Sequence, residues 1–193
     1  MTADSGAQDD SPRGRTLTTR RAYSGRIISL DIDRVQFPDG SVGELEMIRH
    51  PGASAVVPFL SVRAELDSEV LLIRQYRHAA ERFLYEVPAG RLDPGELPPD
   101  CARRELKEET GYTAGSVEYL FTMFTTPGFT DERIHVFMAS GLVLGETARE
   151  PDEFMSLETV TLARALELVK TGGIQDAKTA LAILYAARFR AQS

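Results

Sequence analysis

The segment from Gly90 to Tyr112, GRLDPGELPPDCARRELKEETGY, constrains this chain more than any other part of its sequence. Its first half contains two glycines and three prolines, whereas its second half contains no helix-breaking residue before Gly111. Proline is tolerated in the first turn of a helix, and glycine often ends one by adopting a left-handed conformation. The segment therefore predicts a loop followed by a helix from about Pro99 to Thr110.

Three glutamates of this helix, Glu105, Glu108 and Glu109, are spaced so that their carboxylates share one face. Carboxylates at this spacing repel one another unless a positive charge lies beside them. A hard divalent cation is suitable, because Mg²⁺ and Mn²⁺ prefer oxygen ligands, and Mg²⁺ usually retains waters and substrate phosphates. Arg104, four residues before Glu108, could orient one acid through a paired hydrogen bond. For an isolated RELKEETG, a helix face that simply contacts solvent is the alternative interpretation.

The wider segment extends this pattern to nine fixed positions, which match the signature called the Nudix box. These positions are Gly90, Glu96, Arg104, Glu105, Leu106, Glu108, Glu109, Gly111 and Tyr112. The chain therefore resembles the Nudix hydrolases. The resemblance implies an α/β fold, a Nudix-type α/β/α sandwich with a mixed central sheet and an N-terminal antiparallel hairpin or sheet. It also implies metal-dependent hydrolysis of a nucleoside diphosphate linked to another moiety.

The resemblance also implies roles for individual residues. The metal ligands would be Glu105 and Glu109, with Glu108 close by and the carbonyl of Ala89 as a further oxygen. Gly90, Glu96 and Arg104 would be supporting residues. A loop at 145–154 would supply one more catalytic or metal-binding glutamate, for which Glu153 is the first candidate and Glu150 the second. The general base could be either Glu108 or Glu153, and solvent-exposed acids are the alternative for this loop.

Apolar patterns predict strands on both sides of the box. Two of these strands, at 55–60 and 70–78, are expected to be central in the sheet. A third strand, at 83–90, leads into the box. Two more strands follow the box, at 117–126 and 133–139. In the resembled group the QYR triplet supplies a substrate contact, which would be Arg77; a surface arginine pair with Arg74 is the alternative. Glu86 is expected near the metal site or in a structural ion pair. Two amphipathic helices, 161–173 and 176–190, are expected to cover the sheet.

A loop, TPGFTDE, separates the two strands after the box. Its Pro127 lies sixteen residues beyond Gly111, an offset that marks the Nudix enzymes resembling ADP-ribose pyrophosphatases. Proline and glycine make a loop whose backbone can approach a ligand closely, so Gly128 and Phe129 are predicted to contact substrate. Glu132 can accept hydrogen bonds from ribose hydroxyls, although a plain loop carboxylate is the alternative.

The chain before the first central strand predicts two further parts. Residues 1–19 are polar and lack periodicity, and they are expected to form a disordered tail. Residues 20–50 alternate around a Pro-Asp-Gly turn and predict an N-terminal β-sheet extension. In the resembled group this sheet packs across a homodimer and contributes basic residues to the substrate, here Arg26 and Arg49; an ordinary surface role is the alternative for each. Residues 51–193 would form the Nudix hydrolase domain.

Composition restricts the partners and the cellular compartment. The net charge of −7 argues against nucleic acid as a partner, because binding a phosphate backbone requires clustered lysines and arginines. The single cysteine, Cys101, is compatible with a reducing compartment and is interpreted as a small helix residue rather than a nucleophile. No apolar run is long enough to span a membrane and no signal peptide is recognisable, so a cytoplasmic protein is expected.

The sequence is compatible with three functions. The favoured one is Mg²⁺-dependent or Mn²⁺-dependent cleavage of ADP-ribose to AMP and ribose 5-phosphate. The second keeps the chemistry but changes the leaving group, as in a nucleotide sugar such as GDP-mannose. The third is a regulatory Nudix-like module that senses a nucleotide without cleaving it. Such modules usually have damaged box residues or an attached DNA-binding domain, whereas every acid of the box is present here.

Overall fold

The computed structural model describes residues 13–61, 65–145 and 155–190, and these divide into two compact units. The first unit contains the N-terminal residues up to His50 together with Thr126–Asp131. The second contains Pro51–Thr125 and the chain from Glu132 onward. The loop predicted to contact substrate therefore belongs largely to the first unit, and the box belongs to the second.

The first unit is an antiparallel sheet of three strands in the order β1-β2-β3. Strands β2 (Ser29–Gln36) and β3 (Val42–Arg49) form the predicted hairpin around a tight turn. In this turn the Phe37 N–H donates to the Ser41 carbonyl over 2.8 Å, and Gly40 has a φ of 84° that favours glycine. The alternation of apolar residues was therefore a correct indicator of the hairpin.

Strand β1 (Arg15–Ser24) was not predicted as a strand, and it corrects the end of the expected disordered tail. The prediction placed residues 1–19 in that tail, but the structure pairs residues from Arg15 onward with β2, and residues 1–12 lie outside the described part. Every residue of β1 is exposed, so the strand has no buried face to produce an apolar alternation. Its threonines suit a strand, but its stabilisation comes from pairing with β2.

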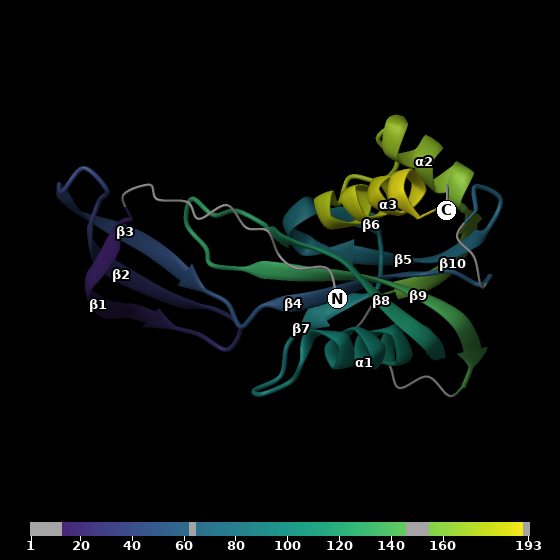
Figure 1. Ribbon diagram of the computed structural model, residues 1–193, viewed down its shortest axis with the longest axis horizontal. Coiled ribbons are helices and arrows are strands. Elements are labelled where there is room, and N and C mark those ends of the chain that lie inside the picture. Colours follow the sequence, from purple (N-terminus) through teal and green to yellow (C-terminus); the bar gives the residue numbers. More distant parts are fainter. Residues whose placement is uncertain (1–12, 62–64, 146–154, 191–193) are drawn as a thin grey trace. The chain divides into compact units, whose positions relative to one another are not determined.

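The second unit contains two sheets (Figure 1). One has the order β7-β4-β9-β8 and is mixed, because β4 (Ala53–Pro58) runs parallel to β9 (Arg133–Leu144) and antiparallel to β7 (Ala89–Arg91). Its outer strand is β8 (Tyr112–Phe124). The other sheet is antiparallel, with β5 (Glu69–Arg77) between β10 (Met155–Thr161) and β6 (Arg82–Glu86), and the 3₁₀ helix η1 (His78–Ala80) joins β5 to β6. The strands predicted as central, β4 and β5, are each interior in their own sheet.

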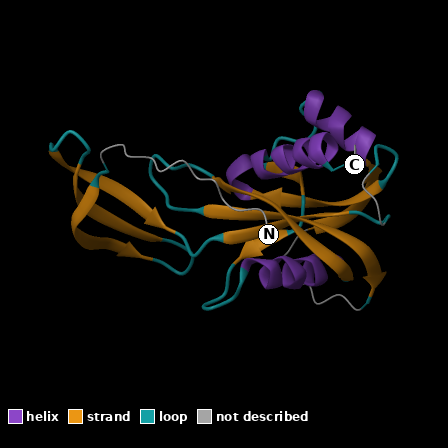
Figure 2. Ribbon diagram, in the orientation of Figure 1, coloured by secondary structure: helices purple, strands orange, loops and turns teal. Residues whose placement is uncertain are grey.

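Helices cover both faces of the mixed sheet, which confirms the α/β/α sandwich (Figures 1 and 2). Alternate residues of β4 pack on opposite faces of the sheet. Ala55 and Val57 belong to the core that contains α3 (Ala177–Phe189), whereas Val56 packs with α1 (Pro98–Thr110). Helix α2 (Leu162–Lys170) lies beside α3 and contacts β10. A strand that is buried on both faces reads as a continuous apolar run, which is why 55–60 was recognised as central.

The segment predicted as one strand, 83–90, is divided between the two sheets. Strand β6 ends at Glu86 and β7 begins at Ala89, so the chain changes sheets at Val87 and Pro88. Proline has no N–H to donate and interrupts a ladder, although its carbonyl here accepts a bond from the Val56 N–H over 2.9 Å. This corner brings the end of one sheet next to the start of the box.

None of the described helices is both long enough and apolar enough to cross a membrane.

The packing of α1 on the sheet depends on Leu106, and its truncation provides a test. Leu106 is fully buried with Val56, Ala102 and Phe137. Leu106→Ala is expected to lower the free energy of unfolding by about 2–5 kcal/mol, because it removes buried methylene groups and leaves a cavity. Urea denaturation measures this change, and Leu184→Ala, which truncates an exposed leucine of α3, is the matched control. Equal losses in the two variants would contradict the packing described.

Candidate active site

Helix α1 begins and ends as its sequence predicts, with a difference of one residue at its start. It runs from Pro98 to Thr110, with prolines in its first two positions. Gly111 ends it with a φ of 79°, and its N–H donates to the Lys107 carbonyl over 2.8 Å. The preceding loop is held by short-range bonds, including 3.0 Å from the Asp93 N–H to Glu96. The box is thus an ordered strand, loop and helix.

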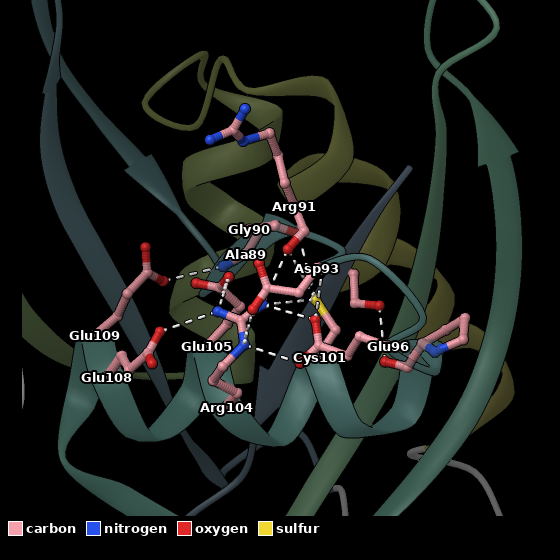
Figure 3. A network of polar contacts seen from close by, with 12 residues as sticks. Ala89, Gly90, Arg91, Asp93, Glu96, Cys101, Arg104, Glu105, Glu108 and Glu109 are labelled. Carbon is pink, nitrogen blue, oxygen red and sulfur yellow. Dashed lines mark hydrogen bonds and ion pairs between the residues drawn. The ribbon is translucent and has the colours of Figure 1, made fainter. Parts of the chain in front are cut away.

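The guanidinium of Arg104 is the centre of a polar network on this helix (Figure 3). It donates two nearly parallel bonds to Glu96, both of 2.9 Å. Its Nη1 lies 2.6 Å from Glu105 and 3.0 Å from Glu108, and its Nη2 donates to the Arg91 carbonyl over 2.9 Å. Arg104 therefore links the loop, strand β7 and two of the three neighbouring acids, which is more than the single orientation predicted from its spacing.

The three glutamates predicted to hold metal differ in their surroundings. Glu109 is buried, and its Oε2 accepts a bond of 3.0 Å from the Ala89 N–H. The side chain of Glu105 is 12% exposed, whereas that of Glu108 is 42% exposed. Their spacing thus places two shielded carboxylates and one accessible carboxylate along one helix.

Gly90 leaves the space that Glu105 occupies. A Cβ built on Gly90 would lie 2.0 Å from Oε1 of Glu105, which is far inside van der Waals contact. Any other residue at position 90 would therefore displace this carboxylate. The structure therefore gives a steric reason for glycine at position 90. The sequence pattern alone did not provide this reason.

These residues are suited in kind to a divalent cation. In the described part of the chain, no three side chains of His, Cys, Asp or Glu are already gathered as a metal site. Arg104 instead provides positive charge beside Glu105 and Glu108. The available donors are nevertheless carboxylate oxygens, which Mg²⁺ and Mn²⁺ prefer, and Mg²⁺ needs only a few of them from the protein. The assignment of Glu105, Glu108, Glu109 and the Ala89 carbonyl as ligands stays a prediction.

Cys101 is a buried component of the same region. Its Sγ lies 3.6 Å from the Gly90 carbonyl and 3.5 Å from that of Arg91. Burial raises the pKa of its thiol to about 11. A thiol with this pKa stays protonated at neutral pH, so the residue is suited to packing rather than to nucleophilic attack.

Arg77 and Glu86, which the sequence assigned separately, are brought together by the structure. The Nε of Arg77 donates to Glu86 over 2.6 Å and its Nη2 donates over 2.9 Å. Lys178 of α3 binds the same carboxylate. Burial by itself raises the pKa of Glu86, but the bond from Arg77 and the charge of Lys178 outweigh it and lower that pKa. Of the two roles considered for Glu86, the ion pair is the one observed.

The other predicted substrate residues fall in different parts of the structure. Within the first unit, Arg26 is exposed in the bend between β1 and β2, and Gly128 and Phe129 lie in the loop Thr126–Asp131. The Phe129 ring is half exposed, while its carbonyl accepts a bond of 2.8 Å from the Ile48 N–H. Within the second unit, Glu132 accepts a bond of 2.8 Å from the Thr125 hydroxyl. The loop candidates Glu150 and Glu153 lie outside the described residues.

Arg49 has partners that the sequence analysis missed. It binds two buried acids, Asp31 over 3.1 Å and Asp33, and also Asp131 over 3.3 Å. The bond to Asp33 is the main cause that raises the pKa of Arg49. The sequence LDID at 30–33 already indicated that the two acids share one face of the strand, because they alternate with apolar residues. The predicted substrate role of Arg49 remains a prediction.

The bond between Arg104 and Glu96 predicts a pH dependence of stability. Hydrogen bonds from Arg104 are the largest cause that lowers the pKa of Glu96 from 4.5 to about 2. Because the folded-state pKa is the lower one, this stabilisation is complete above pH 4.5 and is lost as the pH falls toward 2. Urea denaturation should therefore show a steeper loss of stability over this range for the native protein than for Glu96→Gln. Glu167→Gln on α2 is the control, and identical slopes for native protein and Glu96→Gln would contradict the expectation.

Comparisons with known proteins agree with this geometry. The family model of the NUDIX domain matches residues 50–181. The chain is 42% identical over 173 residues to the ADP-ribose pyrophosphatase of Bacillus subtilis (strain 168), covering 89% of this chain and 91% of that protein. It is 40% identical over 173 residues to the methanol dehydrogenase activator of Bacillus methanolicus, with the same shares covered. A crystal structure of an ADP compounds hydrolase aligns with a TM-score of 0.74 over 90% of this chain and 92% of its own, at 22% identity, and supports the fold. The chain therefore belongs to the Nudix hydrolase family.

Proposed function

We propose that this Nudix hydrolase cleaves the pyrophosphate bond of ADP-ribose in a Mg²⁺-dependent or Mn²⁺-dependent reaction that yields AMP and ribose 5-phosphate. The observation that carries the proposal is the intact box, in which two shielded glutamates and one accessible glutamate lie along a single helix beside Ala89 and Gly90. The 42% identity to an ADP-ribose pyrophosphatase supports this substrate. The Pro127 loop supports it further, through the resemblance described for the sequence.

The proposed reaction follows from charge. A pyrophosphate carries anionic oxygens that repel a nucleophile, and a divalent ion, when bound, would neutralise this charge and make water a better nucleophile. Glu105 and Glu109, with the Ala89 carbonyl, are proposed to hold such an ion. The oxygen of water forms a bond to one phosphorus, the bond from that phosphorus to the bridging oxygen breaks, and the second phosphate leaves with the bridging oxygen.

A general base must accept the proton of the attacking water. Glu108 is one candidate, because its side chain is the most exposed of the three box glutamates considered and reaches solvent. Glu153 is the other, proposed from the family resemblance. Arg77 is proposed to bind a phosphate oxygen, and Glu132 to accept a hydrogen bond from a ribose hydroxyl. Arg26, Arg49, Gly128 and Phe129 are proposed as further substrate contacts.

The substrate is tested by incubation with ADP-ribose, GDP-mannose, NADH and diadenosine polyphosphates. Each is supplied with Mg²⁺, and products are identified by chromatography. The highest kcat/KM is expected for ADP-ribose, with AMP and ribose 5-phosphate as products and no reaction after chelation of the metal. Faster cleavage of GDP-mannose would support the nucleotide-sugar alternative. Binding of a nucleotide without cleavage of any compound would support the sensing module.

The role of the box is tested by Glu109→Gln. This change keeps the shape of the side chain and removes the charge proposed to hold the metal. We expect kcat to fall by at least about 100-fold, because the charge on the phosphates is then left uncompensated. The matched control is Glu167→Gln, the same change on an exposed face of α2, which should retain full activity. Full activity of a folded Glu109→Gln protein, checked by circular dichroism, would reject the assignment.

We also propose a homodimer formed through the three-stranded sheet of the first unit. That sheet and its connecting bend expose six large apolar side chains, which an interface would bury. They are Leu17, Tyr23, Val42 and Leu45, with Ile27 and Ile28 in the connecting bend and at its end. Sedimentation velocity is expected to give a dimer, and a monomer at working concentration would contradict this proposal.

We propose the cytoplasm as the location and a small molecule as the only class of substrate. The buried free thiol of Cys101 is compatible with a reducing compartment. The net charge of −7 supports a small anionic substrate bound at local cations rather than a nucleic acid. Fractionation of the producing cells, followed by immunoblotting, tests the location.

A further inference from the structure

A buried carboxylate with two cationic partners lies at the end of β6. Glu86 is 3% exposed, and both of its oxygens are used. Arg77 approaches it through two bonds of 2.6 Å and 2.9 Å, and the Nζ of Lys178 contacts Oε2. A buried charge with two such partners is costly to leave unpaired, so this arrangement is expected to be specific.

The same carboxylate is tied to helix α3. Lys178 also binds Asp176 over 2.9 Å, and Asp176 caps α3 by accepting a bond of 2.9 Å from the Thr179 N–H. The Thr179 hydroxyl in turn accepts a bond of 2.9 Å from the Val87 N–H, next to Glu86. The start of α3 therefore holds the chain at the point where it leaves β6 for the box.

The strand register shows that the Arg77 pair does not arise from direct strand pairing. In the ladder between β5 and β6, Glu86 lies opposite Ile73 and Arg77 lies opposite Arg82. Arg77 is thus four residues along the strand from the position opposite Glu86, a separation of about 13 Å along an extended strand. Both side chains must therefore extend toward each other along the strand to form the two bonds.

The guanidinium lies between this buried cluster and solvent. The side chain of Arg77 is 44% exposed, whereas that of Glu86 is 4% exposed. The paired bonds use Nε and Nη2, and the second terminal nitrogen can donate to another acceptor. Hydrogen bonding to Glu86 raises the pKa of Arg77 against the effect of burial, and the charge of Glu109 adds to the increase.

The charges within the cluster balance. Arg77 and Lys178 contribute two positive charges, and Glu86 and Asp176 contribute two negative ones. Lys178 therefore shares the compensation of Glu86, so the arginine is not its only counter-ion. The four charges cancel, so the cluster would not repel an anionic group that approaches the exposed side of Arg77. Such a group could accept a hydrogen bond from the guanidinium.

We infer that Glu86 is a positioning residue, which orients the guanidinium of Arg77 toward an anionic phosphate oxygen of the substrate while Lys178 compensates the remaining charge. The inference rests on the proposed function, in which Arg77 binds the pyrophosphate. It adds a residue outside the box to the substrate site. A purely structural role for Glu86, tying β5 and β6 to α3, is the competing explanation.

A double-mutant cycle separates these explanations. The variants are Glu86→Gln, Arg77→Ala and the double variant, and the quantities are kcat and KM for ADP-ribose with Mg²⁺, together with its Kd by calorimetry without metal. Glu86→Gln should raise KM and Kd about tenfold, which corresponds to about 1.4 kcal/mol of lost binding, and should change kcat less than about twofold. In the Arg77→Ala background the same change should have no further effect.

The matched control is Glu158→Gln in the neighbouring strand β10. Glu158 accepts a bond of 3.0 Å from the Tyr85 hydroxyl in the same sheet, so the change tests loss of a polar contact there without touching Arg77. It should leave KM and Kd unchanged. If Glu86→Gln does not fold, the cycle is measured with Glu86→Asp, which retains the charge but shortens the reach to Arg77 and should also raise KM and Kd.

Several outcomes would overturn the inference. One is an unchanged KM and Kd in the folded Glu86 variant with a lower melting temperature, which is the result of a purely structural role. Independent, multiplying effects of the two substitutions would also overturn it, as would an Arg77→Ala protein that binds ADP-ribose normally. In each case the native protein would still cleave ADP-ribose, whereas absence of cleavage by the native protein would reject the proposed function itself. The calorimetric cycle does not require turnover and therefore reports on Glu86 even then.

Discussion

The structure of the site depends on the attraction between one guanidinium and the acids around it. Carboxylates one helical turn apart repel, and Glu105, Glu108 and Glu109 lie at this spacing. Arg104 offsets this repulsion by binding Glu105 and Glu108, and it is itself held by Glu96 from the preceding loop. The helix can thus carry three carboxylates on one face while folded, which is the feature on which the proposed metal site depends.

Backbone geometry decides where this helix meets the sheet. The corner at Val87 and Pro88 transfers the chain from the antiparallel sheet to the mixed one, and Ala89 and Gly90 follow at once. Gly90 leaves room for the carboxylate of Glu105, and the Ala89 N–H binds Glu109. One short segment therefore positions two acids of α1, and the network of Glu86 and α3 holds the other end of the same corner.

Local patterns in the sequence were sufficient for much of the fold. Helix α1 was predicted to within a residue because proline and glycine mark its ends, and β4 was recognised because a strand buried on both faces is apolar throughout. Strand β1 was not recognised, because an edge strand whose residues are all exposed has no apolar face to produce an alternating pattern. The division of 83–90 into two strands was missed, although Pro88, which has no N–H to donate to a strand ladder, lies where the chain leaves β6 for β7.

The sequence by itself determined the local structure of the box, because the order Gly90, Glu96, Arg104 and the three glutamates specifies a loop, a helix and a shared face through spacing alone. Only the tertiary structure decided which charges from different elements compensate one another. The pairing of Arg77 with Glu86, the contribution of Lys178, and the binding of Arg49 by Asp31 and Asp33 join side chains that strand register and helix packing bring together. The physical reason is that residue spacing predicts contacts only between neighbours along one helix or strand. An ion pair forms wherever two charged side chains are close in space, however far apart they lie in the sequence.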